Sequence, residues 1–149
     1  MEKNQLKLNF KQIEHNSVDY WKAVELRDKV LRKPLGLEFS EKELMEEHTQ
    51  IHYAAFYQNE LIACLSLVPL DHSRIKMRQV CTHPDFSGKG VGRQLAKFTE
   101  QKLSELGYKT IECNARKTAV SFYEKMNYKV ISDVFYEVGI EHFKMEKSL

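Results

Sequence analysis

The sequence predicts an α/β or α+β domain built on a mixed sheet, and three features of the chain favour that class. Apolar residues alternate with polar ones in several short segments, as in half-buried strands, and recur at helical spacing in others. Along the chain these segments follow the order βα(α)βββαβαββ. A glycine-rich loop joins a strand to a helix in the second half. The 149 residues, 42% hydrophobic and 30% charged, are expected to form a single domain over residues 1–149 with its own core.

The first part of the chain is predicted to hold one strand and two helices. Apolar and polar residues alternate from Leu6 to Phe10, which indicates a half-buried strand. Ser17 is a suitable cap for an amphipathic helix over residues 18–31. Ser40 and Glu43 have the spacing of a capping box, which predicts a second, short helix toward residue 47.

A hairpin and a further strand are predicted next. Residues 51–57 and 61–68 are rich in apolar residues and are joined by a short polar turn, as in a hairpin. Residues 75–82 form another strand, but their apolar alternation changes parity between Met77 and Val80. A β-bulge would cause such a change.

The rest of the chain is predicted to alternate between helices and strands. These elements are a helix over residues 91–106, a strand over 110–113, a helix over 119–126, and two strands near 129–135 and 141–145. Gly107 is a good residue to end the first of these helices, and Asn127 can adopt the left-handed conformation after the second.

Composition excludes several classes of protein. Lys and Arg number 23 against 21 Asp and Glu, so the net charge of +2 does not suggest non-specific nucleic-acid binding. The longest apolar run is too short to span a bilayer, and residues 1–8 carry no signal-peptide core. Cys64, Cys81 and Cys113 are odd in number and lack metal-ligand spacing. We therefore expect a cytoplasmic protein with no structural metal, membrane or nucleic-acid partner.

The glycine loop at residues 87–92 carries the main functional signal. Glycines allow a tight bend and a close approach to a ligand, and the first N–H groups of the helix that follows have no acceptor within it. With Lys89 and Arg93 at the same end, the loop favours an anion such as a pyrophosphate. A Walker loop is excluded because Gly90 follows Lys89, and the third glycine of a dinucleotide fingerprint is absent.

Two segments resemble one known family. Residues 80–95 resemble the acetyl-CoA-binding motif of the GNAT superfamily of N-acetyltransferases, in which R/Q-x-x-G-x-G/A opens a helix. Gly90 and Gly92 match that pattern, and Ser87 stands where the family prefers Arg or Gln. Residues 114–128 resemble the second family signature, and both ends of the chain resemble small bacterial, ElaA-like members.

The resemblance implies a GNAT-type, mostly antiparallel sheet with helices on both faces, and acetyl transfer from acetyl-CoA, as co-substrate, to an amine by direct attack in a ternary complex. It implies that backbone groups of Val80, Cys81 and Thr82 meet the pantetheine arm and the oxyanion. It assigns Tyr123 as the acid that protonates the leaving thiolate. Backbone N–H groups of seven residues are implied to hold the pyrophosphate: Ser87, Gly88, Lys89, Gly90, Val91, Gly92 and Arg93.

Several alternatives stay open at this point. No carboxylate occupies residues 76–79, where many family members carry the general base. Candidate bases are Glu112, Glu137, His72 and His142, or a chain of water molecules. A non-catalytic acyl-CoA-binding regulatory or interaction domain is the alternative function, and transfer of a longer acyl group is a variant. The sequence fixes neither the acceptor, a small molecule or a peptide or protein amine, nor whether two copies pair through their C-terminal strands.

Overall fold

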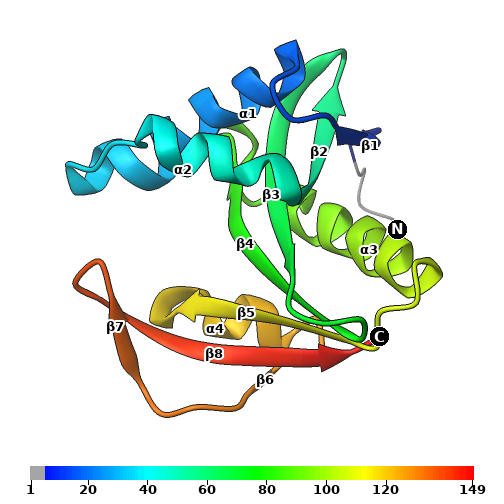
Figure 1. Cartoon of the computed structure of the whole chain (residues 1–149), viewed down its shortest axis with the longest axis vertical. Coiled ribbons are helices and arrows are strands. Elements are labelled where there is room, and N and C mark those ends of the chain that lie inside the picture. The colour runs from blue at the N-terminus through cyan, green and yellow to red at the C-terminus, as the bar shows by residue number, and fades with distance from the viewer. Residues whose placement is uncertain (1–5) are drawn as a thin grey trace. The chain divides into compact units, whose positions relative to one another are not determined.

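The computed structural model of the chain describes residues 6–149 (Figure 1). These residues form two compact units, each with buried apolar side chains of its own. The first unit comprises the described residues up to Leu67 together with Gln79–Thr99. The second comprises Val68–Arg78 together with Glu100–Leu149.

The first unit is built around strand β2, which pairs antiparallel with β1 on one side and β3 on the other. Its strands are β1 (Asn9–Ile13), β2 (Ile51–Tyr57), β3 (Glu60–Pro69) as far as Leu67, and the end of β4 (Arg74–Thr82). Its helices are α1 (Val18–Arg27), α2 (Glu41–Glu46) and the first part of α3 (Val91–Glu105). Gln58 and Asn59, which join β2 to β3, both have positive φ, as a tight hairpin turn of the primed type requires.

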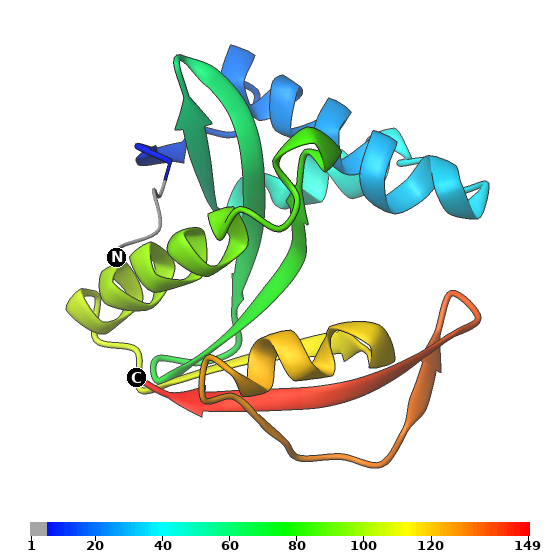
Figure 2. The ribbon, with the colours of Figure 1, turned by 180° about the vertical axis from the view of Figure 1, so that it is seen from behind.

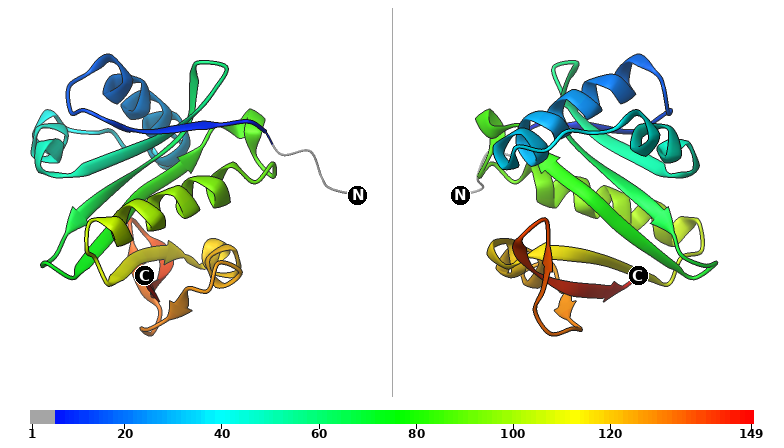
Figure 3. Two further views of the ribbon diagram at one scale, coloured as in Figure 1. Left: turned by 90° about the vertical axis from the view of Figure 1, so that its right-hand side faces the viewer. Right: turned by 60° about the vertical axis from the view of Figure 1, so that its left-hand side comes forward.

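Helices cover both faces of these strands. His52 and Tyr53 are neighbours on β2, so their side chains point to opposite faces. The ring of His52 contacts Tyr20 of α1 at 5.4 Å between centroids, and the ring of Tyr53 contacts Phe98 of α3 at 5.3 Å. Helices α1 and α3 therefore pack on opposite sides of the first unit's strands, as Figure 3 also shows.

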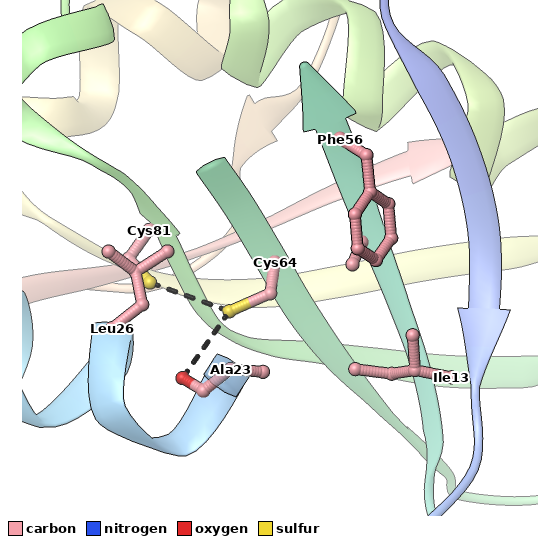
Figure 4. Close-up of a cluster of buried hydrophobic side chains, with 7 residues drawn as sticks. Ile13, Ala23, Leu26, Phe56, Cys64 and Cys81 are labelled. Atoms are coloured by element: carbon pink, nitrogen blue, oxygen red, sulfur yellow. Dashed lines mark hydrogen bonds between the residues drawn. The ribbon is translucent and has the colours of Figure 1, made fainter. Parts of the chain in front are cut away.

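The face toward α1 holds a small apolar core. Its buried members come from α1 and four strands (Figure 4): Ile13, Ala23, Leu26, Ala54, Phe56, Cys64 and Cys81. Burying such side chains stabilises a fold by about 25 cal/mol for each Å² of apolar surface removed from water. The cluster fixes α1 against the strand that leads into the glycine loop, since Cys81 lies on β4 and Leu26 on α1.

The second unit is a sheet in which β5 is central. The start of β4 pairs parallel with β5 (Thr110–Arg116), and β8 (Ile140–Ser148) pairs antiparallel with the other edge of β5. Two short strands, β6 (Lys129–Val130) and β7 (Phe135–Glu137), both pair antiparallel with β8. Helix α4 (Val120–Glu124) lies alongside β5, as Figure 2 shows.

The predicted fold class is confirmed. Antiparallel pairs dominate a mixed sheet, β4 and β5 form a parallel pair, and helices lie on both faces. Several local predictions are confirmed as well. Ser17 accepts a hydrogen bond from the Tyr20 N–H, and the Ser40–Glu43 capping box is complete. Gly107 and Asn127 have the left-handed φ expected after helices.

Other boundaries were wrong. The first strand begins at Asn9 rather than Leu6, because pairing with β2 over residues 52–56 selects residues 9–13. The helix predicted over residues 18–31 is regular only to Arg27, and a π-helical turn and a 3₁₀ turn carry the chain to Leu35. The strand predicted near residues 129–135 is two short strands. Between them the pairing with β8 becomes irregular: the Ile131 N–H still donates to the Lys144 carbonyl, but the Lys144 N–H donates to the Ser132 side chain instead of a main-chain carbonyl.

The irregularity expected in β4 is present, but the buried side chains do not follow the predicted pattern. Gln79 has φ of 56°, a left-handed conformation inside a strand. Ile75, Met77 and Cys81 are buried, so the buried positions keep one parity along β4 and do not pass to Val80 and Thr82. The apolar pattern therefore located the strand correctly, but it predicted burial of Val80 and Thr82 where the structure buries Cys81.

Candidate active site

The glycine loop turns the chain from β4 into α3. After β4 ends at Thr82, His83 Nδ1 accepts a hydrogen bond from the Asp85 N–H at 3.1 Å, which caps a 3₁₀ turn over Pro84–Phe86. Gly88 and Gly90 follow, with φ of 74° and 79°. A Cβ atom at either glycine would meet nothing within 4 Å. The left-handed backbone, rather than a lack of space, is what requires glycine here.

The start of α3 offers main-chain donors to an anion. Gln94 donates the first helical hydrogen bond, to the Gly90 carbonyl at 3.0 Å, so earlier N–H groups have no acceptor within the helix. The first turn holds no acidic residue, and Lys89 and Arg93 are exposed beside it. Partial positive charge at a helix start and two nearby cations favour a negatively charged ligand.

The end of β4 lies next to that loop in the chain. Val80 and Thr82 are half-buried, and Cys81 is buried with its Sγ 3.6 Å from Cys64 Sγ (Figure 4). The pKa of the Cys81 thiol is raised, first by the hydrogen bond with Cys64 and second by burial. A neutral thiol is a poor nucleophile, so Cys81 has the properties of a packing residue and not of an attacking group.

An ion pair buried in the first unit borders this strand. Arg27 of α1 and Glu47, directly after α2, form two hydrogen bonds: Nη2 to Oε1 at 2.8 Å and Nη1 to Oε2 at 3.0 Å. Their residues are 2% and 3% exposed. The side chain of Gln79 joins the pair, accepting from Arg27 at 3.1 Å and donating to Glu47 at 3.2 Å. The Tyr20 hydroxyl donates to Glu47 at 2.7 Å.

The charges of this cluster stabilise each other. Burial alone would raise the pKa of Glu47, but hydrogen bonds and charge from Arg27 bring it below its usual value. Burial would lower the pKa of Arg27, and Glu47 keeps it raised instead. Sequence reasoning did not assign a function to this cluster. The sequence carries one sign of this cluster. Arg27 follows Ala23 by four residues and Tyr20 by seven, so a charged residue occupies the apolar stripe of the predicted helix.

Tyr123 belongs to the second unit, on α4. It is buried, and its ring packs against Phe122 and Tyr128 at 5.1 and 5.4 Å between centroids. Within residues 6–149 no hydrogen bond engages its hydroxyl, whereas the Tyr128 hydroxyl donates to Glu100 at 2.9 Å. Burial, and to a lesser degree the nearby Cys113, raises the pKa of the Tyr123 phenol, which therefore keeps its proton at neutral pH.

The candidate bases differ in what surrounds them. Glu112 is buried and accepts from Arg74 Nη1 at 2.9 Å, with Lys144 Nζ at 3.7 Å. Both of its carboxylate oxygens are therefore already engaged by cations. His72 is exposed in the turn between β3 and β4.

His142 and Glu137 form a different arrangement. His142 Nδ1 lies 2.8 Å from the Ile140 carbonyl, which can only accept, so Nδ1 carries the hydrogen and leaves the lone pair of the neutral ring on Nε2. Glu137 Oε2 lies 3.6 Å from that Nε2, and Glu137 Oε1 accepts from Asn114 at 2.9 Å. A carboxylate in this position can accept a hydrogen bond from Nε2 only when that nitrogen carries a hydrogen.

The predicted site residues thus fall into two groups. Val80–Thr82 and Ser87–Arg93 lie in the first unit, separated in the chain only by residues 83–86. Tyr123, His142 and the candidate carboxylates belong to the second unit. Among the described residues no three His, Cys, Asp or Glu side chains are grouped to hold a metal ion. None of the helices in residues 6–149 combines the length and apolar character needed to cross a bilayer.

Comparison with known proteins places the chain among acetyltransferases. A family model described as an acetyltransferase (GNAT) domain matches residues 25–149. YitI of Bacillus subtilis, an uncharacterised N-acetyltransferase, is 27% identical over 92% of this chain and 97% of its own. Escherichia coli ElaA superposes with a TM-score of 0.79 at 19% identity, covering 95% of this chain and 99% of ElaA. A GNAT acetyltransferase from Elizabethkingia anophelis, solved with acetyl-CoA bound, gives 0.74 at 18% identity, covering 95% and 98% of the two chains. At these identities the solved structures share the fold.

Proposed function

The chain belongs to the acetyltransferase (GNAT) family, and from that premise we infer that it transfers the acetyl group of acetyl-CoA to a primary amine. The observation that carries the inference in this chain is the pair of left-handed glycines, Gly88 and Gly90, placed before a helix start with free N–H groups and no acidic residue. That arrangement matches the chemistry of a diphosphate. We place the protein in the cytoplasm, which suits three free, buried cysteines.

The first unit is proposed to bind the co-substrate through its main chain. N–H groups from Gly88 to Arg93 would donate to the diphosphate, whereas the Ser87 N–H, implied by the family resemblance, already donates to the Pro84 carbonyl at 3.1 Å. Lys89 and Arg93 would add charge. N–H and C=O groups of Val80–Thr82 would pair with the pantetheine amides, and one N–H there would stabilise negative charge that develops on the thioester oxygen. Main-chain donors suit this task because they are fixed before the ligand arrives.

We propose direct transfer in a ternary complex. The amine nitrogen bonds to the acetyl carbon, the bond from that carbon to sulfur breaks, and coenzyme A leaves as a thiolate that takes up a proton. Tyr123 is proposed as the donor of that proton. Support comes from a hydroxyl that no described residue engages, on a phenol that carries its proton at neutral pH.

The amine must lose a proton, since a primary alkylamine has a pKa near about 10. Of the predicted candidates, the pair formed by His142 and Glu137 has the best geometric support. His142 Nδ1 faces the Ile140 carbonyl, which leaves the lone pair on Nε2, and Glu137 Oε2 lies 3.6 Å from that nitrogen. Glu112 is already held by Arg74 and Lys144. We therefore propose His142 as the base, oriented by the Ile140 carbonyl, which accepts from Nδ1.

The acceptor is proposed to be a small molecule or an exposed peptide amine. Turnover of acetyl-CoA with a panel of such amines, followed as release of the coenzyme A thiol, tests the function. We expect release that depends on both the enzyme and the amine. Binding of acetyl-CoA without thiol release for any acceptor would support the non-catalytic regulatory domain, and no binding would overturn both.

A further inference from the structure

We propose that Gln79 is a positioning residue: the buried Arg27–Glu47 pair grips its side-chain amide and so fixes the left-handed turn in β4 that presents Val80 and Cys81 to the pantetheine arm. This inference rests on the proposed binding of acetyl-CoA. It adds a specific support for that binding, formed by side chains that do not themselves meet the ligand.

The backbone at Gln79 needs such support. Its φ of 56° lies in the left-handed region, which is unfavourable for a residue with a Cβ and foreign to a regular strand. Asn16, Gln58, Asn59 and Asn127 are also left-handed, and they lie in turns or directly after a helix. Gln79 instead lies inside β4, and just after the end of that strand the His83 N–H donates to the Ile62 carbonyl of β3 at 2.7 Å.

The contacts of the Gln79 amide use both of its polar ends. Oε1 accepts from Arg27 Nη1 at 3.1 Å, and Nε2 donates to Glu47 Oε2 at 3.2 Å. One face of the ion pair therefore offers a donor and an acceptor side by side, which an amide matches. A carboxylate at position 79 would face Glu47 with like charge, and an apolar side chain would leave both partners one hydrogen bond short.

The Arg27–Glu47 pair holds the Gln79 amide rigidly because its two residues come from different helical segments of the first unit. Arg27 ends α1, and Glu47 follows α2. Two hydrogen bonds join them, and Glu47 also accepts from the Tyr20 hydroxyl at 2.7 Å. The Arg27 guanidinium lies 5.0 Å from the centre of the Phe39 ring, within the range of a cation–π contact. Charged side chains buried to this degree move little, so they hold the strand at a fixed point.

The test compares two ligands on a single variant. Gln79→Ala removes both hydrogen bonds and keeps a Cβ, so the turn in β4 should relax. Isothermal titration should then show acetyl-CoA bound roughly tenfold more weakly, while the phosphoadenosine diphosphate half of coenzyme A, which lacks pantetheine, keeps its affinity within about twofold. A general loss of structure would weaken both ligands together.

Two further variants sharpen the result. Gln58→Ala introduces the same substitution at another left-handed glutamine, in the β2–β3 turn, and should leave both affinities unchanged. Gln79→Gly tolerates the left-handed backbone without the side chain, so its affinity for acetyl-CoA should fall between those of wild type and Gln79→Ala. It also provides a folded variant where Gln79→Ala does not fold.

Unchanged acetyl-CoA affinity in a folded Gln79 variant, or equal weakening of the two ligands, would overturn the role of Gln79. Wild-type protein that binds neither ligand would instead overturn the proposed function itself. The two failures are therefore separated by the wild-type titration alone.

Discussion

The two units of the molecule offer different kinds of candidate functional groups. In the first, the candidate ligand contacts are main-chain groups whose direction is set by left-handed residues, Gly88, Gly90 and Gln79. In the second, the candidates are side chains, Tyr123 and His142, whose behaviour is set by burial and by their neighbours. The direction of main-chain donors depends on backbone conformation, whereas the chemical behaviour of a side chain depends on the groups that surround it.

That difference decides what each region tolerates. A main-chain donor survives many side-chain changes but is lost when the backbone changes conformation. A side-chain acid survives backbone adjustments but is lost with one atom, the hydroxyl oxygen. Substitutions in the two units should therefore separate ligand affinity from turnover.

The largest effect is expected at Gly90. Gly90→Val places a β-branched residue at φ of 79°, so the loop must change conformation and the donors to the diphosphate lose their alignment. We expect acetyl-CoA affinity to fall on the order of a thousandfold, as the loss of several hydrogen bonds to a charged group implies. Isothermal titration measures it.

Gly36→Val is the matched control for this substitution. Gly36 is also left-handed, with φ of 69°, and a Cβ there likewise meets nothing within 4 Å. It follows a 3₁₀ turn before α2, so it carries the same backbone strain away from the loop. If both variants bind alike, strain in general and not the loop explains the effect.

Tyr123→Phe should be next, with turnover affected and binding spared. Removing the hydroxyl leaves the leaving thiolate without its proton donor, and kcat should fall roughly a hundredfold while acetyl-CoA affinity stays the same. Tyr128→Phe, which removes a hydroxyl engaged by Glu100, is the control and should retain kcat. An unchanged rate for Tyr123→Phe would remove it from the acid role.

A smaller effect, on stability alone, is expected at Glu112. Glu112→Gln removes the charge held by Arg74 and Lys144 and should lower the free energy of unfolding by about 1 to 2 kcal/mol, a modest value because Arg74 is one-third exposed. Urea unfolding measures this change. A drop in kcat with unchanged stability would instead identify Glu112 as the base.

The smallest effect is a pH dependence in the first unit. Burial is the main cause that lowers the pKa of His52, whose Nε2 donates to the Glu47 carbonyl at 3.0 Å. As the pH falls, the unfolded chain therefore binds a proton at His52 at a higher pH than the native chain does. This contribution to stability is full above pH of about 6.5 and is lost as the pH falls through the native pKa.

The melting temperature should therefore fall by a few degrees, roughly 2 to 4 °C for each kcal/mol, as the pH is lowered from about 7 to about 5. His52→Gln should flatten that slope, whereas His72→Gln, at an exposed turn, should leave it intact. Equal slopes in all three proteins would exclude His52 as the source.

The sequence predicted the backbone conformation of the glycine loop better than it predicted the surroundings of the candidate catalytic side chains, for a physical reason. Glycine and asparagine signal their conformation directly, so the loop at residues 87–92, Gly107 and Asn127 could be placed from residue type alone. Which residues of β4 are buried could not be predicted in this way, because Gln79 takes a left-handed conformation that no local preference suggests. Its partners, Arg27 and Glu47, are 52 and 32 residues away in the chain.

The limits of prediction were similar for the strands. Residues 6–10 alternate as well as residues 9–13 do, and only pairing with β2 chooses between them. The division of β6 from β7 follows from which residues remain in register with β8, a relation between distant segments. For the same reason, sequence could name Glu112, Glu137, His72 and His142 as bases but could not rank them.

The buried cysteines have a practical consequence for assays of this protein. A colorimetric reagent that reports thiols cannot reach Cys64, Cys81 or Cys113 in the native molecule, since all of them are buried. Burial also raises the pKa of Cys113 to about 12, so it stays unreactive at neutral pH. The folded enzyme should thus give no background colour of its own. A sudden gain of three reactive equivalents per chain would report denaturation rather than catalysis.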